Sequence, residues 1–294
     1  MIAIALSALL FGACTAGDPV VLGGAEISAS RLERGERLYI HYCATCHGID
    51  GDGQGPSSPG LWPPPRDFRT ATFKYAGTTG QDLPADAELA RIVRSGLTGT
   101  AMLAWDLSDG ELFPILDYIK TFSPPGEGFR DPDRQLSSPK IPPDPYQGKE
   151  AAAIEFGEKL YHVDFQCNQC HPSYVTPDRY ADWGAFPPRA TNIYDPVPKW
   201  SPAFATVLLP PDFLRHPMRS VRTTKTGENV ADLYRVIAYG LAGPMPGYGH
   251  LGADKIWAIA HYVASLARLR QTPEGRALRH RLDALPQNIP LPPP

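Results

Sequence analysis

The sequence predicts an all-α protein made of two tandem domains that a proline-rich linker joins. Three observations predict this architecture. A Cys-x-x-Cys-His motif occurs twice, at residues 43–47 and 167–171. Each copy is followed by the same order of helical patterns, which indicates an internal repeat. Prolines are concentrated between the copies, over residues 124–147, and such a stretch is typical of a semi-rigid spacer. A chain of 294 residues is long enough for two domains of ordinary size.

The overall composition is that of a globular protein and not of a nucleic-acid binder. Hydrophobic residues make up 43% of the chain, and the formal net charge is −3. Lysines and arginines are dispersed along the sequence, so the basic patch that binds phosphate backbones is not expected. We therefore expect no nucleic-acid partner.

An apolar segment opens the chain and ends at a cysteine. Residues 1–13 are too short for a bilayer span of about 20 residues and resemble the apolar core of a signal peptide. The residues before Cys14 resemble a bacterial lipoprotein cleavage site, which makes Cys14 the expected lipidation site; an ordinary cleaved signal and an intact anchor are the alternatives. Residues 1–27 are assigned to this segment and a linker. The protein is expected on the periplasmic side of a bacterial membrane, lipid-anchored or otherwise soluble in the periplasm.

Helical patterns surround the first motif within an expected domain at residues 28–123. A helix is predicted to start at Ser30, with Glu33 completing a capping box, and to run into the motif. Further helices are predicted over residues 86–95 and 109–122. The stretch after the motif is rich in glycine and proline, which indicates a loop.

The same order of elements returns in an expected second domain, residues 148–268. Helices are predicted over residues 149–165, 230–239 and 253–266. The loop after the second motif is about twenty residues longer than its counterpart and is rich in Tyr, Trp and Pro. Residues 269–294 are expected to form an extended or disordered tail.

Each motif has the spacing of a covalent haem attachment site. Two thiols three residues apart on a helical turn can add to both vinyl groups of one haem, and the adjacent histidine can then ligate the iron. Half of a zinc site is the alternative for a single copy, but two copies, each followed by a Gly-rich loop with a methionine, favour two covalently bound haem c groups. The residues expected to hold them are Cys43, Cys46, His47, Cys167, Cys170 and His171.

With this order of parts the chain resembles the class I cytochrome c family, in a tandem di-haem form such as the c4-type or related fused cytochromes. The resemblance covers residues 30–122 and 149–267. It implies two class I cytochrome c domains, in each of which the helix carrying the motif crosses the last helix, and a methionine from a late loop is the sixth iron ligand. The expected crossing pairs are Gly35 with Tyr118 and Gly157 with Tyr262.

The resemblance implies that His47 and Met102 are the axial ligands of the first haem, and that His171 and Met245 are those of the second. The residues alone also favour Met102, because it is the sole methionine of the expected first domain and lies in a Gly-rich loop. Leu103 follows it where the family often has proline.

In the second domain other side chains compete with Met245. They are Met218, His216 and His250. A haem with two histidine ligands would have a lower reduction potential than one with His and Met.

The remaining histidines and aromatics have ordinary structural interpretations. His41, His162 and His261 lie on predicted helices and are expected at the surface or in packing. A repeated Arg/Pro-Asp-Phe sequence at residues 66–68 and 211–213 would either position haem propionates or cap a loop. The aromatics expected to pack around haem are Trp62, Tyr75, Trp105 and Trp257.

A haem iron held by His and Met has no vacant position, which favours one-electron transfer over catalysis. The sequence therefore predicts a di-haem electron carrier, free or as a subunit of a respiratory or photosynthetic electron-transfer complex, with redox proteins or such a membrane complex as partners and no catalytic residues. The alternative is a di-haem enzyme, a peroxidase or a sulfur-compound oxidoreductase, with a labile sixth ligand at the second haem. A structural zinc protein is a third class.

Overall fold

The protein is mostly helical, with 44% helix and few short strands, as the sequence predicted. The computed structural model describes residues 18–78, 82–188, 193–204, 206–225, 227–243 and 245–285. Cys14 and the apolar segment before it lie outside the described residues. Within the described part of the chain, no helix has both the length and the apolar character that crossing a bilayer requires.

The first half of the chain, residues 18–137, is organised around two packed helices, α1 (Ala29–Tyr42) and α4 (Asp109–Lys120). The short helix α2 (Ala44–His47) follows α1, and α3 (Asp86–Ser95) packs on α4. The short strands form an antiparallel hairpin of β1 (Val20–Leu22) with β2 (Ala25–Ile27) and a parallel pair of β3 (Leu83–Pro84) with β4 (Leu136–Ser137).

The second half, residues 149–285, repeats this arrangement with additions. α5 (Glu150–Lys159), which continues in a π-helical turn over Leu160–Asp164, packs against α8 (Ala253–Arg268), and α7 (Val230–Tyr239) packs on α8. The additions are α6 (Pro177–Asp182), α9 (Pro273–Asp283), the hairpin β5 (Lys199–Ser201)–β6 (Thr206–Leu208) and the small hairpin β7 (Thr223–Thr224)–β8 (Gly227–Glu228).

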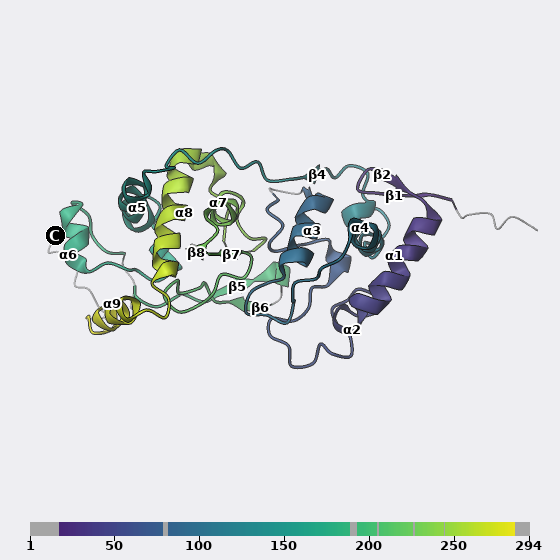
Figure 1. The fold of residues 1–294 in the computed structure, drawn as a ribbon, viewed down its shortest axis with the longest axis horizontal. Helices are drawn as coiled ribbons and strands as arrows, with labels where there is room; N and C mark the ends of the chain where they lie inside the picture. Colours follow the sequence, from purple (N-terminus) through teal and green to yellow (C-terminus); the bar gives the residue numbers. More distant parts are fainter. Residues whose placement is uncertain are drawn as a thin grey trace, which may run out of the picture.

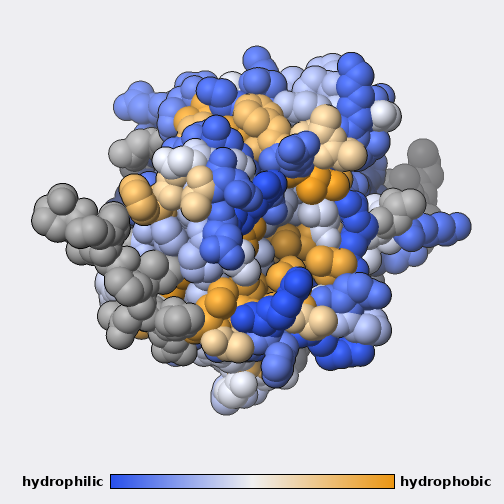
Figure 2. Space-filling model, turned by 90° about the vertical axis from the view of Figure 1, so that its left-hand side faces the viewer, coloured by the Kyte–Doolittle hydropathy of each residue, from blue (hydrophilic) through white to orange (hydrophobic). Residues whose placement is uncertain are grey.

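The two halves lie one after the other along the longest axis of the molecule (Figure 1). α3 of the first half and α7 of the second face the middle, and the β5–β6 hairpin of the second half reaches towards the first. Figure 2 shows the far end of the second half, where hydrophobic side chains form separate groups among hydrophilic ones.

Each pair of long helices crosses at a glycine, as the sequence predicted. A Cβ atom on Gly35 would collide with the carbonyl oxygen of Pro114 and lie 2.9 Å from the Cβ of Tyr118. A Cβ atom on Gly157 would collide with the carbonyl oxygen of Ala258, and would lie 2.9 Å from the Cβ of Tyr262. The helices therefore pack backbone to backbone, which only glycine allows. This close contact fixes the helix ends from which the two motifs start.

Polar contacts join the halves at the middle of the molecule. Arg235 of α7 forms an ion pair with Glu88 of α3, Nη1 to Oε1, at 2.7 Å, and Glu88 also pairs with Arg91. All three side chains are largely buried. The Tyr239 hydroxyl of α7 accepts a hydrogen bond from the amide of Lys140, in the segment that connects the halves, at 2.6 Å.

Several local expectations were wrong. The first helix begins at Ala29 with Ser28 as its cap, because the Ser28 hydroxyl accepts from the Arg31 amide. Residues 273–283 of the expected tail form α9, since Thr272 caps the helix and Pro273 occupies its first turn. Trp62 is not in the core: it is 71% exposed.

Candidate haem sites

The first motif occupies the turn at the end of α1. The Cys43 amide donates to the Tyr39 carbonyl at 2.8 Å and ends α1, and the His47 amide donates to the Cys43 carbonyl at 2.9 Å. This turn places the half-buried side chains of Cys43, Cys46 and His47 on the wall of one cavity. The structure therefore brings together the three residues that the motif predicted.

The imidazole of His47 is fixed from behind by the loop that follows the motif. Its Nδ1 donates to the Arg66 carbonyl at 3.1 Å, since a carbonyl can only accept, and its ring stacks on Phe68 with centroids 4.4 Å apart. This tautomer leaves the lone pair of Nε2 free for a metal. Burial lowers the pKa of His47, which favours the neutral form that a ligand must have.

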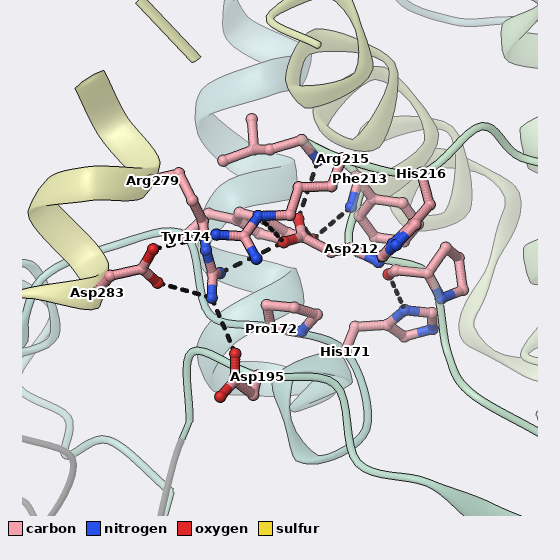
Figure 3. Close-up of polar contacts among 12 residues, drawn as sticks. His171, Pro172, Tyr174, Asp195, Asp212, Phe213, Arg215, His216, Arg279 and Asp283 are labelled. Carbon is pink, nitrogen blue, oxygen red and sulfur yellow. Dashed lines mark hydrogen bonds and ion pairs between the residues drawn. The ribbon is translucent and has the colours of Figure 1, made fainter. Parts of the chain in front are cut away.

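The second motif repeats this geometry. The His171 amide donates to the Cys167 carbonyl at 3.0 Å, and Nδ1 of His171 donates to the Pro211 carbonyl at 3.1 Å (Figure 3). The ring of His171 stacks on Phe213 with centroids 4.9 Å apart. The repeated sequences at 66–68 and 211–213 thus supply the carbonyl and the aromatic ring that hold each histidine.

A buried carboxylate locks the loop that holds His171. Asp212 is 2% exposed and accepts hydrogen bonds from the Leu214 amide at 3.0 Å and the Tyr174 hydroxyl at 3.3 Å. Nη1 of Arg279, on α9, lies 3.5 Å from Asp212, so the C-terminal helix is tied to the back of the second site (Figure 3). Asp212 therefore acts here as a loop cap.

The two methionine loops also have matching backbones. The amide of Leu97 donates to the Met102 carbonyl at 2.8 Å, and the amide of Leu241 donates to the Met245 carbonyl at 3.0 Å. Each loop begins at a glycine with positive φ. Because this glycine has no side chain, the backbone segment that carries the methionine can pass close to it. These glycines are Gly96 and Gly240.

Met102 lies on the wall of the cavity that also contains the first motif. In the second half, Met245 and Cys167 pack against the same hydrophobic core. The competing Met218 is buried within that core, and His216 and His250 are exposed at the surface. Of these four side chains, Met245 is the one whose loop repeats the loop of Met102.

The other candidate residues have structural roles. The exposed His41 agrees with its surface assignment, and His261 pairs with Asp144 at 2.8 Å. His162 is 1% exposed and links two backbone segments: Nδ1 donates to the Glu158 carbonyl at 2.8 Å, and Nε2 accepts from the Tyr174 amide at 3.1 Å.

Of the aromatics expected to pack around haem, Tyr75 and Trp105 line the first cavity. Trp257 is buried in the core of the second half against Tyr234.

The first cavity suits a flat, largely apolar group with a charged edge. Aliphatic and aromatic side chains form most of its wall, and Arg66, Lys74 and Arg219 lie at one part of it. The buried Nε of Arg66 has no hydrogen-bond partner, and a buried unpaired cation favours an anionic partner. Haem combines an apolar ring with two carboxylates, so these residues fit it.

The donor set fits a zinc site poorly. A structural zinc site brings four Cys, His, Asp or Glu side chains around one ion. The residues that the structure describes contain no group of three or more His, Cys, Asp or Glu side chains placed to hold a metal ion.

Sequence reasoning missed the residues of the second half that line the first cavity. They are Phe204, Thr206, Leu208 and Arg219. The length and aromatic content of the loop after the second motif were the signals, but neither says which surface the loop covers.

Comparison with known proteins supports a c-type cytochrome. Residues 30–119 match the family model of cytochrome c oxidase, cbb3-type, subunit III. Such a family carries covalently bound haem c, so the match supports haem at the first motif and electron transfer as its role. No curated protein matches the chain.

Among solved structures, the chain is similar to one from the Kuenenia stuttgartiensis reducing HAO-like protein complex. The two share 25% sequence identity with a TM-score of 0.58, over 80% of this chain and 96% of the other. The similarity therefore extends through both halves of this protein and is consistent with a redox protein partner.

Proposed function

We propose that this protein is a di-haem c-type cytochrome with one class I cytochrome c domain in each half. The observation that carries the proposal is the repeated histidine geometry. Both motif histidines donate Nδ1 to a loop carbonyl at 3.1 Å and stack on a phenylalanine. Both halves also share the helix crossing at a glycine and the methionine loop that a backbone hydrogen bond to the methionine carbonyl closes.

The roles of the side chains follow from this geometry. Cys43 and Cys46 would bind the first haem through thioether bonds, and Cys167 and Cys170 the second. His47 and His171 would each present Nε2 to an iron, because the carbonyl contact holds the opposite nitrogen as a donor. When bound, the haem supplies a one-electron redox couple.

Met102 and Met245 are the residues that would supply the second protein ligand to each haem iron. A thioether raises the reduction potential relative to a second histidine and leaves no open iron position. The aliphatic and aromatic wall of the first cavity would lower the exposure of a bound haem to water, which would limit the reorganisation that accompanies a change of charge.

We propose a redox protein as partner, in the periplasm or at the membrane surface, with Cys14 as a lipid anchor. The similarity to a chain from a HAO-like protein complex supports a role as an electron-transfer subunit, and the sequence before Cys14 supports export. Mass spectrometry of the mature N-terminus tests this part: a diacylglyceryl group on Cys14 is expected, and an unmodified cleaved or retained segment would contradict the anchor.

An enzyme with an open iron at the second site is the alternative. The experiment that separates the two is carbon monoxide binding by the reduced protein, combined with the far-red Met–iron charge-transfer band of the oxidised protein. For an electron carrier we expect a charge-transfer band whose intensity accounts for both haems, and no binding of carbon monoxide. Rapid carbon monoxide binding or peroxide turnover by the wild-type protein would contradict it.

Paired variants assign the methionines. Met245→Ala is expected to open the second haem to carbon monoxide and to leave the spectrum of the first unchanged, and Met102→Ala is expected to do the converse. Met218→Ala is the matched control, because Met218 is a buried methionine of the same half that lies outside the loop carrying Met245. Opening of the second haem by Met218→Ala, and not by Met245→Ala, would overturn the assignment.

A further inference from the structure

The cavity of the first site is closed in part by the second half of the protein. Thr206 and Leu208 of β6 line it, together with Phe204 just before this strand. Val207 points the other way: it is 52% exposed and pairs across the hairpin with the exposed Trp200. The alternation expected of a strand thus gives the hairpin one face towards the cavity and one towards solvent.

Arg219 extends the same contact between the halves. Its carbonyl accepts a hydrogen bond from the amide of Thr98, in the methionine loop of the first half, at 2.9 Å. Its guanidinium lies close to the hydroxyl of Tyr75 and lines the cavity. Both contacts fix Arg219 against the first site, although it lies more than 100 residues further along the chain.

Three cations gather where the halves meet. The guanidinium of Arg66 lies 4.7 Å from the ring centre of Phe204, and the ammonium of Lys74 lies 5.7 Å from the same centre. Burial, together with the charges of Arg219 and Arg66, lowers the pKa of Lys74 to about 8. Burial also lowers the pKa of Arg66. The ammonium of Lys74 is therefore destabilised by its two cationic neighbours.

No carboxylate of the described residues pairs with these cations within 4.0 Å. The nearest acidic neighbour along the chain, Asp67, is engaged by Arg69 at 2.8 Å. A cluster of partly buried cations without a counter-ion is unfavourable, and guanidinium groups match carboxylates in geometry and charge. The cluster therefore indicates an anionic group on whatever occupies the cavity.

We propose that the second half completes the first haem site: Arg219, with Arg66 and Lys74, binds the haem propionates, and the β5–β6 hairpin covers that edge of the haem. The inference rests on the proposed function, because it needs haem at Cys43 and Cys46. Arg219 would thus contact a haem that is held by the other half of the protein. The reduction potential of the first haem would then depend on the position of the second half relative to the first.

Arg219→Gln tests this proposal, with Lys225→Gln as the matched control. Lys225 is an exposed cation six residues further on that does not line the cavity, so its removal changes the net charge by the same amount. Reductive titration of the purified holoprotein measures both potentials. The haem whose potential moves in Met102→His is the first haem.

Loss of a cation beside the propionates disfavours the added electron, so Arg219→Gln lowers the potential of the first haem alone. The expected shift is about tenfold in the one-electron equilibrium, as charge interactions at an effective dielectric of about 20 allow, or roughly 59 mV. The resonance Raman propionate-bending mode of that haem shifts as well. Lys74→Gln, in the first half, is expected to shift the reduction potential and the Raman mode of the first haem in the same direction. It replaces Arg219→Gln as the test if that variant does not fold.

Two failures are distinguishable. Protein without haem at Cys43 and Cys46 contradicts the proposed function. Protein with both haems contradicts the inference alone if neither Arg219→Gln nor Lys74→Gln moves the potential or the Raman mode. Equal shifts of both haems, matched by Lys225→Gln, also contradict it, since they show only the effect of net charge.

Discussion

The two halves share the contacts behind the histidines and differ in what covers them. The residue five positions after the crossing glycine shows this difference in covering most clearly. In the first half this residue is Ile40, which is 46% exposed, and in the second half it is His162, which is 1% exposed. His162 is buried because α6 lies over it, with Tyr180 and Trp183 against its ring at 5.8 and 6.1 Å between centroids. Over its described residues, 18–78 and 82–137, the first half has no helix that corresponds to α6.

This difference shows which constraints the site imposes. The crossing glycines, the histidine carbonyl contacts and the methionine loops occur in both halves because each fixes an atom of the candidate haem site. The covering loops are free to vary. In the second half the long loop supplies α6 over its own core, and its hairpin extends over the first site.

The largest change in stability is expected at the helix crossings. Gly35→Ala and Gly157→Ala each place a Cβ against a backbone carbonyl, so each lowers the free energy of unfolding by about 3 kcal/mol, at the upper end for overpacked cores. Gly110→Ala is the control in α4, because its nearest atoms are 3.8 Å away, and it is neutral or stabilising by up to about 1 kcal/mol. Urea unfolding measures all three, and equal effects of the three changes would contradict the close crossing.

The second half alone is expected to lose stability in mild acid through His162. Burial lowers the pKa of His162 to about 3, below its unfolded value of about 6.5. The unfolded chain therefore binds the extra proton between these values, so stability is complete above pH 6.5 and falls as the pH decreases towards 3. The loss at pH 5 is about 2 kcal/mol.

Urea unfolding of the wild type and of His162→Gln, compared from pH 7.5 to 4.5, measures this contribution. The difference between the two proteins isolates His162 from the motif histidines. The same slope with pH in both proteins would show that His162 is not the titrating group.

The smallest effect is expected at the junction. Arg235→Met removes one partner of the buried Glu88 but leaves Arg91 beside it, so we expect a loss of about 1 kcal/mol, below the cost of leaving a buried charge without any partner. Because the ion pair joins the two halves, its loss is expected to weaken the cooperativity of their unfolding. Calorimetry should then show the two halves unfolding in two separate transitions. Retention of the wild-type transition shape would contradict a coupling role for this ion pair.

The parts predicted best from the sequence are those that local signals define. The bounds of α3 and α7 agree with the predicted ranges 86–95 and 230–239, because a glycine stops each helix. The two histidine sites also followed from a local motif whose five residues lie on one turn. The crossing glycines followed from the family resemblance.

The remaining features depend on contacts between distant segments. Arg219 lies next to the first site only because the halves are docked, and α9 is fixed by Arg279 contacting Asp212. Trp62 was expected in a core, but hydrophobicity alone does not fix the direction of a loop side chain. The burial of His162 was hidden for the same reason, since α6 is inserted from elsewhere in the chain.

The central claim is that each half carries one covalently bound haem. The mass of the holoprotein under denaturing conditions tests it most directly, because thioether-bound haem stays on the polypeptide. We expect the mass of the mature chain plus two haems, and the loss of one haem in the double variant Cys167→Ser, Cys170→Ser. A wild-type protein with one haem or none, or a double variant that retains both, would contradict it.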